Sequence, residues 1–229
     1  ALPISEAELL ALIPAYNESE RIARVVQGAR EHVRVCVVDD GSRDDTQEVA
    51  RHSGAEVLRQ EPNQGKGTAL RMGFAHALAA GAAGVITLDA DGQHNPAEIP
   101  LFVENFRRTQ AELVIGCRDF SKMPPIRRLA NTTGRWLLSW AMGQRVEDNQ
   151  SGYRLIGRRL MQGMLDSDEH GFEFEVEMVA RCIRMGWGVE WVPISTIYAG
   201  EKSHIKPLPH AKNFMRVVMK IRKERIQGG

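Results

Sequence analysis

Residues 84–96 read GVITLDADGQHNP, an apolar run that ends in two carboxylates one residue apart. The run 85–88 has the composition of a buried strand, and acidic side chains rarely follow one without a partner that neutralises them. Side chains two residues apart in an extended segment point to the same side, so the sequence predicts that Asp89, Asp91 and Gln93 share one face. Two like charges this close repel unless a cation lies between them, and oxygen ligands suit Mg²⁺ or Mn²⁺.

The same stretch allows two other interpretations. An EF-hand calcium loop is excluded, because His94 occupies the position that needs glycine and Pro100 the position that needs a bidentate glutamate. A solvated turn, in which Asp89 or Asp91 caps the next helix, is the structural alternative. For the D-x-D pattern alone, this turn is as well founded as the metal site.

The pattern around this stretch alternates short β-rich runs with amphipathic helical windows, which favours an α/β fold with a largely parallel sheet. Asn95 followed by Pro96 is a helix-start signal. We expect strands at 9–13, 33–38, 55–59, 85–88 and 113–115, and helices at 19–30, 46–52, 67–80 and 96–110.

The order of elements changes after residue 116. We expect helices at 129–142 and 172–185, strands at 188–192 and 195–198, and a flexible loop over 199–210. The C-terminal stretch is basic: residues 202–229 hold eight Lys or Arg against one acid. Its apolar and basic side chains alternate at helical spacing, which fits a helix on an anionic membrane surface or one docked on the domain or on a partner.

Composition limits the class of protein. The 229 residues suit one sizeable α/β domain, and 30 basic against 29 acidic side chains give a net charge of +1, which offers no argument for nucleic acid. Cys36, Cys117 and Cys182 are widely spaced and odd in number, which is untypical of a disulfide framework or a zinc site and favours a reducing compartment. The N-terminus lacks the basic region of a signal peptide, and no stretch is typical of a membrane span, so we expect a cytoplasmic chain.

Polar residues also follow the other predicted strands, in IPAYNESE (13–20), VVDDGSRDDT (37–46) and NQGKGTALRMGF (63–74). The carboxyl ends of parallel strands meet at one edge of a sheet, where ligands bind. Lys66, between two glycines, suits a phosphate. Neither a G-x-G-x-x-G motif nor a P-loop is present, so the pattern indicates a nucleotide-like site of another kind.

Five ordered motifs, IPAYNE, VVDDGSRDDT, NQGKGTAL, LDADGQHNP and DNQSGYRLI, resemble those of family 2 glycosyltransferases, in particular the polyprenyl-phosphate (dolichyl-phosphate) mannose or glucose synthase branch. The resemblance covers roughly residues 8–200. It implies the GT-A fold, a mostly parallel central sheet with helices on both faces. We expect a catalytic domain over 1–200, with a donor half at about 1–116 and an acceptor half at about 117–200, then a mobile loop and a basic amphipathic helix over 201–229.

The resemblance also implies roles for single residues on the donor side. Asp89 lies near the ribose and the metal, and Asp91 and Gln93 ligate the divalent ion, Mn²⁺ or Mg²⁺, that holds the donor pyrophosphate. The residues implied in the rest of the donor pocket are Pro14, Tyr16, Glu18 and Asp40, which hold the base and ribose, together with Asp39 and Lys66.

On the acceptor side, the resemblance places Arg118 at the reacting phosphates and Arg127 or Arg128 at the acceptor phosphate. Asn149 stands where the family more usually has threonine. The remaining implied contacts are Asp148, Gln150 and Arg154 beside the sugar, and Lys202 and Ser203 in a loop that closes over the donor.

The implied reaction is metal-dependent and inverts the configuration of the sugar. It transfers mannose or glucose from a GDP- or UDP-sugar to a polyprenyl or dolichyl phosphate. We expect the enzyme to be peripheral to the cytoplasmic membrane face. A phosphate acceptor is already ionised, its second pKa being about 6, so cationic groups such as Arg118 and Arg128 would be the key acceptor contacts. A hydroxyl acceptor on a soluble sugar or protein would need a general base, for which Asp148 is the candidate. A catalytically silent nucleotide-sugar-binding protein is the remaining alternative.

Overall fold

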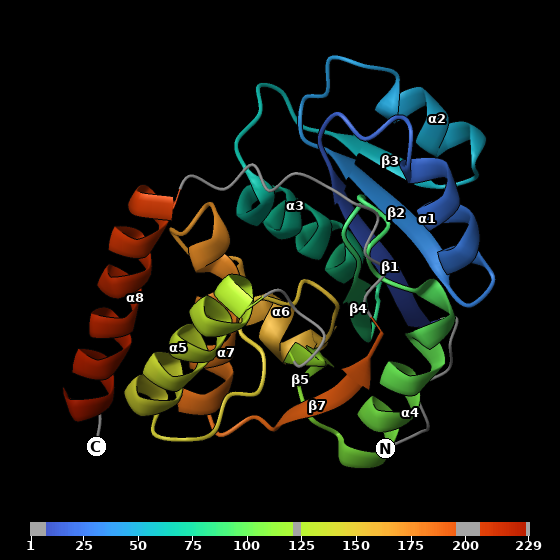
Figure 1. Ribbon diagram of the computed structural model, residues 1–229. Coiled ribbons are helices and arrows are strands. Elements are labelled where there is room, and N and C mark those ends of the chain that lie inside the picture. The colour runs from blue at the N-terminus through green and yellow to red at the C-terminus, as the bar shows by residue number, and fades with distance from the viewer. Residues whose placement is uncertain (1–7, 121–124, 196–206, 228–229) are drawn as a thin grey trace.

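The computed structural model describes residues 8–120, 125–195 and 207–227. Its centre is a seven-stranded sheet in the order β3-β2-β1-β4-β6-β5-β7, in which β6 alone runs antiparallel to its neighbours (Figure 1). The strands are β1 (Leu9–Ala15), β2 (Arg34–Asp39), β3 (Glu56–Arg59), β4 (Gly84–Thr87), β5 (Leu113–Arg118), β6 (Arg154–Gly157) and β7 (Val189–Ile194).

Helices cover both faces of the sheet, and each face has its own apolar core (Figure 1). Alternate residues of β1 show the division, because Leu10 and Leu12 enter one core while Ala11 and Ile13 enter the other. One face carries α1 (Ile22–Arg30), α2 (Thr46–His52) and α4 (Ile99–Thr109), which follows a helical turn at Pro96–Glu98; the other carries α3 (Lys66–Ala79), α5 (Pro125–Met142), α6 (Arg158–Met164), α7 (Phe172–Arg184) and α8 (Pro207–Gln227).

The predicted elements of the first 118 residues are confirmed, with ends that differ by a few residues. The predicted N-cap is also present, since the Asn95 side chain accepts a hydrogen bond from the Ala97 N–H at 3.2 Å. The expectation that residues 89–93 are extended is wrong: β4 ends at Thr87, and Gly92 has φ +77° in the turn that follows.

The second part of the chain departs further from the sequence prediction. The strand β6 and the helix α6 were not predicted, and residues 207–210, expected in a flexible loop, form the start of α8. The strand expected at 195–198 is not present at Ser195, where β7 has already ended, and its other residues lie outside the described part of the chain.

The C-terminal helix α8 packs on the domain. Val217, Val218 and Ile221 are buried against α5 and α7 (Figure 1). The Arg222 guanidinium lies 4.8 Å from the centre of the Trp140 ring of α5. The apolar stripe that the sequence predicted is therefore used within the protein, as in the docking alternative.

Within the described ranges, no helix is both long enough and apolar enough to cross a membrane.

Candidate active site

Asp39 and Asp40, at the end of β2, accept hydrogen bonds from the loops at this edge of the sheet. Asp39 is fully buried, pairs with Arg59 of β3 and accepts a hydrogen bond from the Ser42 N–H at 3.0 Å. Asp40 accepts hydrogen bonds from the Gln60 side chain at 2.5 Å and from the backbone N–H groups of Gln64 and Gly65 at 2.9 and 2.8 Å. Both residues of the predicted donor pocket therefore shape backbone loops beside the N-terminus of α3.

The loop after β1 forms the neighbouring wall. Pro14 is half-buried and Tyr16 is 42% exposed, so an aromatic ring is available at the edge of the sheet. The Glu18 N–H donates to the Thr46 hydroxyl at 2.8 Å, and the Asn17 N–H donates to the Ser42 hydroxyl at 2.9 Å. These two bonds fix the β1 loop against the β2 loop.

A lysine and two carboxylates meet at the centre of this edge. The Lys66 ammonium lies 2.6 Å from Asp89 Oδ1 and 3.2 Å from Glu175 Oε1 of α7. Burial disfavours the charged ammonium, but the two carboxylates outweigh burial, and the pKa of Lys66 is raised. Burial likewise acts to raise the pKa of Asp89, but Lys66 and His94 lower it well below its usual range. Both groups of the Lys66–Asp89 pair are therefore charged at neutral pH.

Gly152 lies directly over the Lys66–Asp89 pair. A Cβ atom at this position would lie 2.7 Å from both Asp89 carboxylate oxygens and 2.8 Å from the Lys66 ammonium. These distances are shorter than van der Waals contact, so a side chain at residue 152 would displace the pair. The glycine of the DNQSGYR motif is required here by close packing.

His94 contacts Asp89 and helps to fix its orientation. Its Nδ1 accepts a hydrogen bond from the Asp89 N–H at 3.1 Å, and its Nε2 lies 3.7 Å from Asp89 Oδ2. The ring stacks on Tyr153 at 5.0 Å. Burial lowers the pKa of His94 despite the neighbouring Asp89, which favours a neutral ring with its proton on Nε2. His94 is a buried support for the acidic turn.

Asp91 and Gln93 form the outer part of this turn. The Gln93 N–H and side-chain amide each donate to an Asp91 carboxylate oxygen at 3.0 Å. Among the described residues, no three His, Cys, Asp or Glu side chains are grouped so that they could hold a metal. The turn thus offers one or two carboxylates and an amide. That donor set fits Mg²⁺ or Mn²⁺ when phosphate oxygens of a substrate supply further ligands.

Arg118 and Asp148 form a second buried pair. Arg118 Nε and Nη2 donate to the two Asp148 oxygens at 2.7 and 2.9 Å, which is bidentate geometry. Asp148 is fully buried and also accepts from the N–H of Gln150, whose side chain is exposed. Both oxygens of the candidate base are therefore already engaged by the arginine predicted to face the phosphates.

Arg154 connects these groups from the interior. It is 1% exposed, and it donates to the backbone carbonyls of Ser151 at 2.8 Å and Glu175 at 2.6 Å. Burial lowers the pKa of Arg154, while the carboxylates of Glu175, Asp148 and Asp89 act in the opposite direction. Arg154 thus links the DNQSGYR motif to α7 through backbone hydrogen bonds in the interior.

The other predicted acceptor residues are only partly placed. Arg128 lies in the first turn of α5 with an exposed side chain. The Arg127 side chain, Lys202 and Ser203 lie outside the described part of the structure.

The sequence analysis did not identify Glu175 as part of the site. Glu175 shares the face of α7 that carries Met178, Val179 and Cys182, all buried. An acid at i of an apolar i, i+3, i+4, i+7 pattern is the signal that could have identified it.

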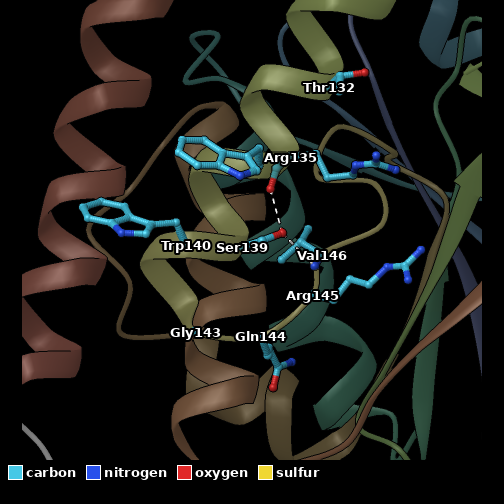
Figure 2. A pocket seen from close by; sticks show the side chains of 9 residues that line it. Thr132, Arg135, Ser139, Trp140, Gly143, Gln144, Arg145 and Val146 are labelled. Atoms are coloured by element: carbon cyan, nitrogen blue, oxygen red, sulfur yellow. Dashed lines mark hydrogen bonds between the residues drawn. The ribbon is translucent and has the colours of Figure 1, made fainter.

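A groove runs along α5 and the loop that follows it. Its volume is about 580 Å³, and it is lined by Thr132, Arg135, Trp136, Ser139, Trp140, Gly143, Gln144, Arg145 and Val146. The Ser139 hydroxyl donates to the Arg135 carbonyl and accepts from the Val146 N–H (Figure 2). Arg135 and Arg145 both contact Glu147, the residue before Asp148. The groove therefore has aromatic and cationic walls.

Comparison with known proteins matches most of this chain to one protein family. The model of "Glycosyl transferase family 2" matches residues 11–165. The chain is 33% identical to the undecaprenyl-phosphate mannosyltransferase of Micrococcus luteus, with 82% of this chain and 83% of that protein covered. It is 32% identical to the polyprenol monophosphomannose synthase of Mycolicibacterium smegmatis, over 81% of this chain and 76% of that one.

A solved structure shows the same fold. Glucosyl-3-phosphoglycerate synthase from Mycobacterium tuberculosis, in complex with Mn²⁺, uridine diphosphate and phosphoglyceric acid, superposes with a TM-score of 0.72 at 22% identity, covering 93% of this chain and 76% of that one. The expected GT-A fold and the family resemblance are thereby confirmed.

Proposed function

The chain belongs to glycosyl transferase family 2, and from this premise we propose that it transfers a hexose from a GDP- or UDP-sugar to a polyprenyl phosphate with the aid of Mn²⁺ or Mg²⁺. The observation that carries this proposal is the joint presence of the Asp89–Asp91 turn and the Arg118–Asp148 pair, on elements that β4, β5 and β6 bring together.

On the donor side, the proposed contacts are the residues that fix the sheet edge. Tyr16 offers a ring for the base, and the loops held by Asp39 and Asp40 form the wall beside it. Lys66 suits the diphosphate, because its ammonium is carried by the first residue of α3 and the start of a helix favours anions. Pro14 and Glu18 complete the base and ribose side of the pocket.

The divalent ion is assigned to Asp89, Asp91 and Gln93. When bound, it acts as a Lewis acid that stabilises the charge on the departing diphosphate. The Gln93 N–H and amide hold the Asp91 carboxylate in one orientation, and His94 holds the backbone of Asp89. The chain therefore supplies ordered carboxylates and leaves the rest of the coordination to donor oxygens.

The geometry of Asp148 supports a phosphate acceptor. A general base for a hydroxyl needs a carboxylate oxygen that can accept the substrate proton, and Arg118 occupies both Asp148 oxygens. An acceptor phosphate is already ionised and needs cationic contacts, so Arg118, Arg127 and Arg128 take that role with Gln150 beside the sugar. Arg154, predicted to contact the sugar, is buried and bonded to backbone carbonyls, so its role is to hold the motif in place. Lys202 and Ser203 are proposed to close over the donor. Attack by the acceptor phosphate then inverts the sugar in a single displacement.

The partner membrane is assigned to the outer surface of α5 and α8. Trp136 and Trp140 of α5 are 66% and 45% exposed, and Met219 of α8 is 55% exposed beside Lys220 and Lys223. Apolar side chains among lysines and arginines suit an anionic bilayer surface. The groove in Figure 2 lies along the same helix and includes Trp136 and Trp140 in its lining, and we propose that the prenyl chain follows it. We therefore propose a peripheral membrane enzyme.

The test is a donor and acceptor screen with purified protein. GDP- and UDP-hexoses are incubated with Mn²⁺ or with a chelator, and with or without a polyprenyl phosphate in vesicles, while nucleoside diphosphate release and labelled lipid are measured. We expect lipid-linked hexose with one donor, dependent on the ion and on the acceptor. Transfer of the hexose to a soluble hydroxyl acceptor, with nucleoside diphosphate released and no labelled lipid formed, would contradict the proposal.

A further inference from the structure

Glu175 stands out in the site because it makes a second contact to a lysine that already has a partner. The Lys66 ammonium is 2.6 Å from Asp89 Oδ1 and 3.2 Å from Glu175 Oε1. The Glu175 side chain is 9% exposed, and its backbone carbonyl accepts a hydrogen bond from Arg154 at 2.6 Å. An acid buried to this degree is costly unless it is paired, so its charge requires an explanation in the site.

A cation that binds the Asp89 carboxylate must share it with the Lys66 ammonium. Its Oδ1 accepts the short hydrogen bond from Lys66, and its Oδ2 lies 3.7 Å from His94 Nε2. A divalent ion and an ammonium compete for the same carboxylate, because both carry positive charge. Lys66 must therefore give up part of its contact with Asp89 when the ion binds.

The surroundings leave Lys66 one other anionic partner among the charged groups described at this point. Gly152 lies over the pair and restricts the space above it. On the other side, the Phe174 Cβ would be 2.9 Å from a Cβ at residue 67, so the first turn of α7 packs tightly against the start of α3. The Glu175 carboxylate thus faces the ammonium from a fixed position.

We propose that Glu175 is a positioning residue that takes over the Lys66 ammonium when a divalent ion engages Asp89. This proposal rests on the metal role assigned to Asp89 under the proposed function. The exchange keeps Lys66 charged and beside the diphosphate throughout, and it lowers the free-energy cost of freeing Asp89 for the ion.

The readout is the metal enhancement, defined as the affinity for the nucleoside diphosphate at saturating Mn²⁺ divided by the affinity without metal. Isothermal titration with GDP and UDP gives both values without turnover. Glu175→Gln keeps the shape and a hydrogen-bond acceptor but removes the charge. We expect it to reduce the enhancement about tenfold, the lower range for loss of an outer-shell partner of a metal site. Because the enhancement is a ratio taken within each variant, any effect of the lost charge on metal-free binding is divided out.

Two further variants separate this role from simpler ones. Glu173→Gln, two residues earlier on α7, is the matched control and should leave the enhancement unchanged. In a Lys66→Gln background no ammonium competes for Asp89, so adding Glu175→Gln should have no further effect. An equal tenfold loss in that background would show that Glu175 acts on the ion directly through its charge, and it would overturn the proposal.

Failure of this inference can be distinguished from failure of the proposed function. A wild-type enhancement of one contradicts the metal role itself and this inference with it. A large wild-type enhancement that Glu175→Gln leaves unchanged overturns the inference alone. Should the glutamine variant not fold, Glu175→Asp, which keeps the charge and shortens the reach, takes its place: a smaller loss supports the proposal, and an unchanged value overturns it.

Discussion

The parts of the chain before and after residue 120 differ in how their charged side chains are paired and how many large apolar side chains they expose. In residues 8–118 the charged side chains of the site form partly buried ion pairs, such as Lys66–Asp89 and Arg59–Asp39. Of the large apolar side chains in these residues, only Tyr16 and Leu101 are exposed among the described residues. The later part exposes eight more, of which Leu129, Trp136, Trp140, Met215, Met219 and Ile226 lie on α5 and α8.

This contrast indicates two kinds of partner. A pocket of ordered carboxylates and backbone N–H groups suits a small polar ligand, because it recognises charge and hydrogen bonds at fixed positions. Exposed Trp and Met side chains among basic residues suit an extended apolar partner with an anionic surface. The proposed function accordingly assigns the nucleotide sugar to the first part and the lipid to the second.

The largest effect should come from the acidic turn. Asp91→Ala removes a proposed metal ligand, and we expect transfer to fall about a thousandfold, as when a group that stabilises leaving-group charge is lost. Steady-state rates at saturating Mn²⁺ measure it. Asp45→Ala, an exposed acid at the start of α2, is the control and should retain full activity. Equal rates for wild type and Asp91→Ala would contradict the proposed role of Asp91 as a metal ligand.

A smaller loss should follow from closing the space over Lys66. Gly152→Ala places a methyl group 2.7 Å from the Asp89 oxygens. We expect kcat/KM for the donor to fall about a hundredfold, since a shift of about 1 Å in a reacting group has that effect. Gly163→Ala, in α6, meets its neighbours at ordinary contact distances of 3.5–3.6 Å and should leave activity intact. Full activity of Gly152→Ala would show that the pair tolerates displacement.

The outer surface of α5 and α8 can be tested apart from the chemistry. The double variant Trp136→Ala and Met219→Ala should weaken binding to anionic vesicles about thirtyfold, because each side chain contributes on the order of 1 kcal/mol when its apolar area is buried. Vesicle sedimentation measures the binding. Leu101→Ala, on α4 at the opposite face, is the control. An equal loss for Leu101→Ala would mean that this surface is not the contact.

The smallest effect concerns the β1–β2 wall. Burial raises the pKa of Asp44, but hydrogen bonds from Thr46 and Ser19 outweigh it and lower the pKa to about 2. A carboxyl whose pKa is lowered by folding stabilises the fold above its ordinary pKa, and this contribution is lost as the pH falls toward 2. Asp44→Ala should therefore cost about 1 kcal/mol at pH 7 and progressively less below pH 4.

Urea unfolding across this range measures the Asp44 contribution. A destabilisation that stays constant from pH 7 to pH 2.5 would contradict the assigned hydrogen bonds.

The sequence predicted the first part of the fold well, because its strands end in polar loops and the helices α1 and α4 are amphipathic. Asn95 is one local signal that the structure confirms. The short strand β6 carried no such signal: its four residues are all buried, and its antiparallel position between β4 and β5 depends on contacts far apart in the chain.

The site was predicted as a set of residues but not as an arrangement. Motif order identified Lys66, Asp89 and Asp148, while their partners come from elsewhere in the chain. Glu175 belongs to α7, and the ion pair between Arg118 and Asp148 spans 30 residues. The turn at Gly92 also replaced the extended segment on which the shared face of Asp89 and Asp91 was argued.

The most direct test compares a polyprenyl phosphate with the polyprenol of the same length, under identical Mn²⁺ and donor concentrations, by mass spectrometry of the lipid product. We expect a hexosyl phosphate lipid from the first and no product from the second, because the site offers cationic contacts to phosphate and no unengaged Asp148 oxygen to activate a hydroxyl. Equal glycosylation of the polyprenol would contradict the account.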